Sequence, residues 1–225
     1  MCRRSAMILV FAFMSMHVDG QSVQNQLGPV SDTQSWDEVD VFTRLEPKLD
    51  VTWIARSRLS EQLSNPVITG FESDWRIEMM KNLAVTPSFE YFLFRSNAGQ
   101  LEHGEDPILE LTPSWAHQRI SLSDRNRFCG RFGTDGIGPS WDYRNRARID
   151  YRLGPSRWNV SAFAWDEAFY YSKYAGWTRN RVAIGARKMM GERVAGNLYF
   201  QWESNQIGEP AHISTIALLM EVRIR

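Results

Sequence analysis

Hydrophobic and polar residues alternate with a period of two along most of the chain from Trp36 onward. The clearest example is the segment 141–152, where one face carries Trp, Tyr, Asn, Ala, Ile and Tyr and the other carries only Asp and Arg. Side chains of a β-strand point alternately to opposite faces, whereas on a helix these arginines would be spread around the axis. The pattern therefore predicts a strand with one largely apolar face and one charged face.

The same alternation recurs along the rest of the chain, and no comparable helical pattern follows residue 20. The further predicted strands are 37–46, 49–59, 71–80, 85–95, 108–119, 125–132, 157–166, 178–188, 193–203 and 211–224. A tilted strand needs about 9 to 11 residues to cross a bilayer, whereas strands of soluble proteins average about 5 to 6. Segments of this length favour transmembrane strands.

Short and long connections alternate between the predicted strands. Tight turns are expected at 47–48, 81–82, 121–124, 154–155 and 190–191, and longer polar links at 60–70, 96–107, 133–140, 167–177 and 204–210. Short turns at one end and longer loops at the other are typical of an antiparallel up-and-down transmembrane β-barrel. We expect about 10–12 strands, and ten or twelve in preference to eleven, because single-chain bacterial barrels normally have an even number.

The N-terminal residues indicate export. Arg3 and Arg4 precede an apolar run at 6–16, which is long enough for the core of a secretory signal but too short to span a bilayer as a helix. We therefore expect a signal peptide over 1–20, a disordered polar leader over 21–35 and one barrel domain over 36–225. Cleavage would leave Cys129 as the single cysteine, so no intramolecular disulfide is expected.

The overall charge argues against nucleic acid as a partner. The chain has 26 basic and 26 acidic residues, whereas proteins that bind nucleic acids usually carry a basic surface. The partners that we expect are the lipid bilayer of the bacterial outer membrane, the barrel-assembly machinery during insertion, and small solutes if the barrel is open.

Four short features in the second half of the chain occur in an order that points to one family. Arg125-Asn126-Arg127, continuing to Arg131, lies in one strand, and the run 143–148 lies in the next. An acidic pair follows at 166–167, and Asn180-Arg181 with Gly185 precedes a strand that contains Tyr199 and Gln201. In this ordered set the chain resembles the domain of unknown function 2490 family. The resemblance implies an outer-membrane β-barrel and a location, and it implies no activity.

Arginine is unusually dense on one face of the predicted strands in this half of the chain. Because an Arg that faces lipid near the bilayer midplane costs about 2 to 4 kcal/mol, we expect these charges to face the lumen. The predicted lumen charge network consists of Arg127, Arg131, Arg144, Arg146, Arg148, Asp150, Arg152, Asp166, Glu167, Arg179, Arg181 and Arg187. It is either a structural network of Arg–carboxylate pairs or a pore lining that selects anions, and the narrowness of a barrel of this size favours the structural role.

The sequence leaves several functions open. A structural or envelope barrel and a narrow channel are the leading ones. A lipid-modifying barrel enzyme using His117 or His212 and a soluble periplasmic barrel of lipocalin type are the alternatives. No motif identifies catalytic residues, a cofactor site or a metal site, so we expect none and do not expect an enzyme.

Overall fold

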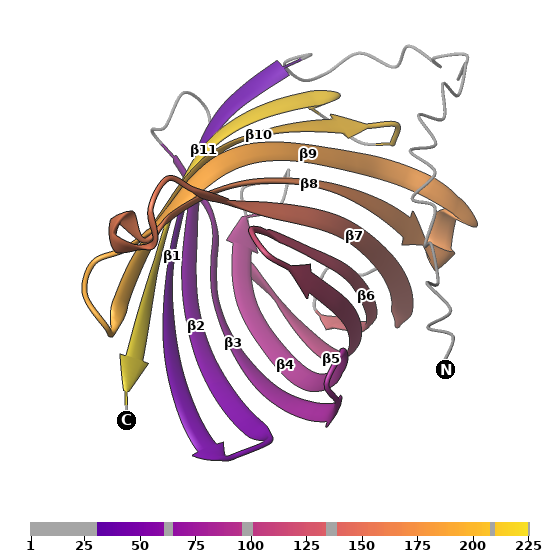
Figure 1. Cartoon of the computed structure of the whole chain (residues 1–225). Coiled ribbons are helices and arrows are strands. Elements are labelled where there is room, and N and C mark those ends of the chain that lie inside the picture. The colour runs from indigo at the N-terminus through magenta and orange to yellow at the C-terminus, as the bar shows by residue number, and fades with distance from the viewer. Residues whose placement is uncertain (1–30, 61–64, 96–100, 134–138, 208–209, 225) are drawn as a thin grey trace, which may run out of the picture.

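The strands form one closed all-β barrel (Figure 1). The computed structural model describes residues 31–60, 65–95, 101–133, 139–207 and 210–224. The strands are β1 (Ser31–Glu46), β2 (Leu49–Ser60), β3 (Asn65–Met80), β4 (Leu83–Arg95), β5 (Leu101–His117), β6 (Ile120–Gly133), β7 (Ser140–Leu153), β8 (Val160–Tyr171), β9 (Gly176–Met189), β10 (Val194–Asn205) and β11 (His212–Ile224). Short 3-10 turns lie at Ser156–Trp158 and Ser172–Tyr174. The expected signal peptide over 1–20 and residues 21–30 of the expected leader lie outside the described residues.

The predicted all-β barrel with about 10–12 strands is confirmed, and each predicted segment overlaps a strand of the wall. The strands are 12 to 17 residues long, and several continue into segments that sequence analysis treats as loops. β1 begins at Ser31, so 31–35 are part of the wall and not of the leader. Their polar composition does not prevent this, because Gln34 faces the barrel interior and is buried there while Ser31 pairs with His212.

The preference for an even number of strands is wrong, because the described residues form eleven. Each strand pairs antiparallel with the next along the chain, from β1–β2 to β10–β11. With an odd number of such strands, the first and the last run in the same direction. The barrel can therefore close only through a parallel pair, and β1 does pair parallel with β11 from Ser31↔His212 to Thr43↔Ile224 (Figure 1).

Because the number of strands is odd, the first residue of β1 and the last residue of β11 lie at opposite ends of the barrel. β1 begins at the end of the barrel that carries the β2–β3 and β4–β5 connections, whereas β11 finishes at the opposite end, beside the turn that joins β1 to β2. At that end the β5–β6 turn lies at Gln118-Arg119, not at 121–124, and Gln118 adopts a positive φ of 52°.

Gly185 makes room for aromatic side chains inside the barrel. A Cβ atom at this position of β9 would lie 2.4 Å from the Tyr199 Cβ and 2.7 Å from the Phe163 Cζ. Two large rings from β10 and β8 therefore approach the β9 backbone only because position 185 has no side chain.

The parallel β1–β11 seam predicts a specific disulfide. Asp37 and Leu218 are directly paired, and both face outward, so Asp37→Cys with Leu218→Cys in a Cys129→Ser background should oxidise to a disulfide. Non-reducing gel electrophoresis of the folded protein should show a shifted band that a reductant removes.

The matched control is Asp37→Cys with Ala217→Cys. Ala217 is one residue away and faces the interior, so its Cβ points to the other side of the wall. Oxidation of this control pair at the same rate would contradict the register of the seam.

Candidate functional site

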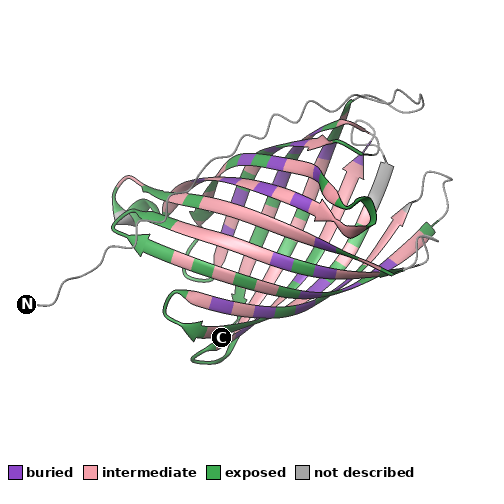
Figure 2. Cartoon of the chain, turned by 90° about the vertical axis from the view of Figure 1, so that its right-hand side faces the viewer, coloured by how far each residue is buried: buried purple, intermediate pink, exposed green. Residues whose placement is uncertain are grey.

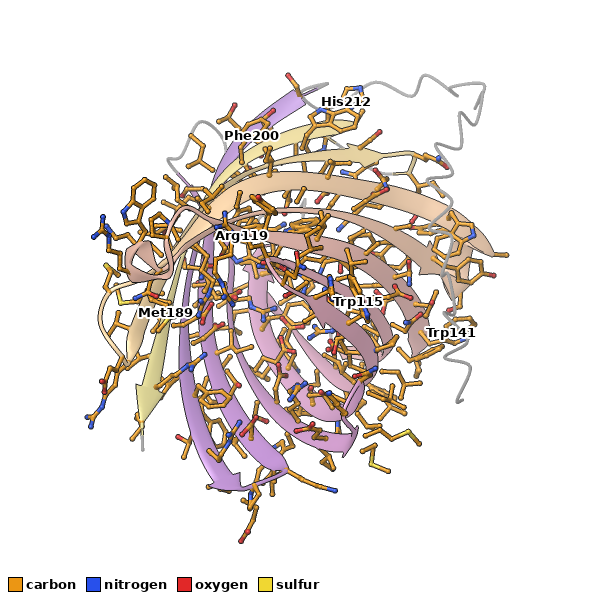
Figure 3. All side chains as sticks on the ribbon, viewed as in Figure 1. Trp115, Arg119, Trp141, Met189, Phe200 and His212 are labelled. Atoms are coloured by element: carbon orange, nitrogen blue, oxygen red, sulfur yellow. The ribbon has the colours of Figure 1, made fainter. Side chains whose placement is uncertain are left out.

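The two faces of the wall differ sharply in polarity. On β10 and β11 the outward residues Leu198, Phe200 and Leu218 are exposed, whereas the inward residues Gln201 and Thr215 are buried. Figure 2 shows the resulting alternation of buried and exposed positions along the strands, and Figure 3 shows side chains filling the space that the strands enclose, with Phe200 and Trp141 outside. This is the reverse of a soluble barrel, whose interior is apolar.

Arg127 connects three strands through ion pairs in the interior. From β6 its Nη2 lies 2.7 Å from Oε1 of Glu72 on β3, and its Nε lies 3.2 Å from Oε2 of Glu110 on β5. Glu72 is 0% exposed and Arg127 is 5% exposed. Because β4 and β5 separate β3 from β6 in the wall, the Arg127–Glu72 pair links strands that are not neighbours and crosses one side of the lumen.

Arg56 on β2 contacts three carboxylates, which come from β1, β3 and β4. It forms an ion pair with Glu72, and its Nη1 lies 2.8 Å from Oε1 of Glu90 on β4. Its Nε lies 3.4 Å from Oε2 of Glu38 on β1. Glu72 is thus held by Arg56 and Arg127 together, which compensates a carboxylate with no access to solvent.

The same network continues through the second half of the barrel. Arg125 on β6 pairs with Glu167 on β8 and lies 3.7 Å from Glu110, which joins the two halves. Arg181 on β9 pairs with Glu203 on β10 and lies 3.9 Å from Glu167. We call the set Glu38, Arg56, Glu72, Glu90, Glu110, Arg125, Arg127, Glu167, Arg181 and Glu203 the central network. Its acids and arginines alternate along the chain of contacts, so each buried charge has an opposite charge beside it.

Smaller clusters lie toward the two ends of the lumen. At the end opposite the short turns, Asp142 accepts hydrogen bonds from Arg131 and Arg144, each over 3.1 Å. Toward the short-turn end, Arg187 lies 2.6 Å from Glu221, and Arg148 pairs with Asp150 of its own strand at 2.8 Å.

The inward face of β8 adds a column of aromatic rings beside these charges. The guanidinium of Arg148 lies 4.3 Å from the ring centroid of Phe163, and that of Arg181 lies 4.6 Å from Phe169. Arg146 lies 5.6 Å above Trp165. Such stacking stabilises a cation without a carboxylate. It explains how Arg146 is accommodated although it forms no ion pair within the described part of the chain.

The structure brings most of the predicted network residues to the interior face. These are Arg127, Arg131, Arg144, Arg146, Arg148, Asp150, Glu167, Arg179, Arg181 and Arg187. Arg152 is exposed near the end of β7. Asp166 lies on the opposite face from Glu167, as successive strand residues must, and accepts a hydrogen bond of 2.6 Å from Asn180 Nδ2.

A second polar cluster occupies this outer face. Asn145 Nδ2 donates to Asp124 Oδ1 over 2.7 Å, and the Tyr143 hydroxyl donates to Asn126 Oδ1 over 2.6 Å. With Asp166 and Asn180 these residues extend across β6 to β9, between outward aromatic residues near the strand ends. We call Asp124, Asn126, Tyr143, Asn145, Asp166 and Asn180 the outer polar cluster.

Sequence analysis missed most of the acids of the central network. Glu38, Glu72, Glu90 and Glu110 come from the first half of the chain, as does Arg56. The signal was present: in 71–80, Phe, Ser, Trp, Ile and Met alternate with Glu, Asp, Arg, Glu and Met. The parity of this alternation assigns Glu72 to the inward face, but no local pattern pairs it with Arg127, 55 residues away.

A closed barrel of strands with a polar interior and an apolar outer face defines a porin-like β-barrel. Among solved structures, one described as "NanC porin structure in rhombohedral crystal form" is similar, with a TM-score of 0.51 and 10% sequence identity over 81% of this chain and 93% of that chain. At this identity the similarity concerns the fold alone. The family model "Protein of unknown function (DUF2490)" matches residues 33–210, more than half of the chain, so the chain belongs to this family. No curated protein matches it.

The central network predicts unequal effects of removing two interior arginines. Arg127→Met leaves Glu72 buried with only one of its two arginines, and breaking a buried ion pair costs about 3 to 5 kcal/mol. Arg146→Met should cost less, because Arg146 contacts a ring and forms no ion pair among the described residues. Urea unfolding of the refolded barrel, followed by tryptophan fluorescence, would compare the two free energies of unfolding. Equal losses of free energy of unfolding in the two variants would contradict the prediction that the ion pairs of Arg127 stabilise the barrel more than the ring contact of Arg146 does.

Proposed function

We propose that this chain is an outer-membrane β-barrel, exported through the periplasm, whose lumen is closed at mid-height by the central network. The observation that carries the proposal is the combination of an apolar outer face with the continuous chain of interior ion pairs, from Glu38 on β1 through Glu72 and Arg127 to Glu203 on β10. Charges that face inward avoid lipid, and their pairing fills the space that an open pore would need. The role that we assign is that of a structural or envelope barrel.

The outer face carries two aromatic belts that support a bilayer location. Their members follow from the positions of the outward aromatic residues along the strands. Near the short-turn end lie Trp53, Trp75, Trp115, Tyr151 and Trp158, and nearer the other end lie Tyr91, Phe132, Trp141, Trp177 and Trp202. Aromatic girdles of this kind mark the two interfaces of a membrane barrel. Such a barrel would require the barrel-assembly machinery for insertion.

A narrow channel is the second candidate, because arginines line the inner face of β7 along much of its length. The lipid-modifying enzyme is less well supported. His117 and His212 lie on strand ends at opposite ends of the barrel and stack on Trp115 and Trp202 at 5.7 and 5.6 Å. A soluble lipocalin-type barrel would need an apolar interior, whereas this interior contains the central network.

Heat-modifiability tests the membrane location. Cell fractionation should recover the protein in the outer membrane, and the unboiled sample should migrate faster on a detergent gel than the boiled one, because a closed barrel resists the detergent. A single unshifted band in the soluble periplasmic fraction would refute the membrane proposal and return the soluble barrel to first place.

Planar-bilayer conductance tests the closure. The natural protein should give no reproducible unitary steps. Glu72→Ser with Arg127→Ser should give steps, because two long buried side chains at the centre of the network become short and both charges of the pair are removed together. The control is Arg148→Ser with Asp150→Ser, a pair confined to β7, which should leave the barrel closed. Steps in the natural protein as large as those of the Glu72/Arg127 variant would instead support the narrow channel.

A further inference from the structure

A cavity opens at the short-turn end of the lumen, away from the central network. Its volume is about 530 Å³, within the range of about 300 to 1,000 Å³ of small-molecule sites. The residues that line it come from β1, β2, β3, β11 and the β9–β10 turn: Phe42, Arg44, Asp50, Arg76, Glu192, Arg193, Arg223 and Ile224. Four arginines thus face two carboxylates, which leaves an excess of positive charge.

The four arginines of this cavity differ in whether they are paired with a carboxylate. Arg44 donates to both carboxylate oxygens of Asp50, over 2.8 and 3.3 Å, and Arg76 lies 3.8 Å from the same carboxylate. Asp50 is therefore satisfied. Arg193 and Arg223 form no ion pair with any described residue within 4.0 Å, and the Arg223 guanidinium lies 5.6 Å from the Phe42 ring centroid. Two guanidinium groups thus remain available on one side of the cavity.

We propose that this cavity binds a small water-soluble anion with two or more carboxylate or phosphate groups, with Arg193 and Arg223 as its principal ligands. A guanidinium matches the geometry of a carboxylate or phosphate through two parallel hydrogen bonds, and the surplus positive charge favours a multivalent anion over a neutral solute. The lining residues of β1, β2 and β3 face the lumen, so the ligand approaches through the barrel mouth. Binding at this end requires neither an open lumen nor the proposed membrane location.

Isothermal titration of the detergent-folded protein with citrate, and separately with pyrophosphate, tests this site at constant ionic strength. The natural protein should bind at least one of the two saturably. Arg193→Gln and Arg223→Gln should each weaken that binding roughly tenfold, as expected when one charge-assisted contact is lost. The matched control is Arg157→Gln, an exposed arginine of the β7–β8 connection at the same end of the barrel. It should bind as tightly as the natural protein.

Each remaining outcome overturns the proposal. Absence of saturable binding of both anions to the natural protein would exclude the site, and equal weakening by Arg157→Gln would show only a general attraction of anions to a basic end. Displacement of the bound anion by phosphatidylglycerol in the micelles would identify a lipid headgroup as the occupant instead of a soluble anion. Heat-modifiability of every variant, measured in parallel, separates loss of binding from loss of folding, and conductance reports on closure independently.

Discussion

The interior of this barrel is constrained by the removal of charge from water in a narrow space. Eleven strands enclose a lumen that side chains largely fill, and most of the charged side chains of the wall point into it. A buried charge without a partner costs several kcal/mol, so arginines and carboxylates must be placed beside each other. The alternation of acid and base through the central network, and the stacking of Arg146 and Arg148 on rings of β8, are two solutions to the same constraint.

The central network restricts which strand pairings are possible. Desolvation offsets much of the attraction in a buried ion pair, but loss of one partner leaves an uncompensated charge, so alternative pairings of the strands are penalised. A shift of one residue in any strand would turn its charges to the outer face and its apolar residues to the interior. The Arg127–Glu72 pair extends this control beyond neighbouring strands, because it forms only when β3, β4, β5 and β6 are all in register.

Local alternation predicted the parts of the fold that depend on one strand at a time. The segment 141–152 was identified from its own residues, and its inward arginines lie where the period of two places them. The local segments already number eleven, and only the general preference for an even number of strands displaced this count. The parallel seam depends on closure of the whole chain, which no local pattern reports. Glu167 and Asp166 show what local alternation does not decide at the site. As neighbours in a strand they must lie on opposite faces, but the sequence does not say which of the two faces inward. Their partners do: Glu167 pairs with Arg125 in the interior, and Asp166 accepts a hydrogen bond from Asn180 on the outer face. The predicted link at 167–177 is longer than the observed connection after β8. Its polar and aromatic residues resemble a loop, but the strand continues to Tyr171.

The outer polar cluster shows that the same rule of compensation applies on the other side of the wall. In the proposed bilayer, Asp124 and Asp166 would lie between the aromatic belts, where exposed polar groups are costly. Each carboxylate accepts a hydrogen bond from a neighbouring asparagine side chain, Asn145 for the first and Asn180 for the second. Hydrogen bonds between side chains on adjacent strands replace those that water would have supplied, and an acidic side chain facing lipid costs less than a basic one. The cluster is therefore compatible with a lipid-facing wall because its carboxylates are hydrogen-bonded by side chains of the same cluster, just as the acids and arginines of the central network are paired with one another.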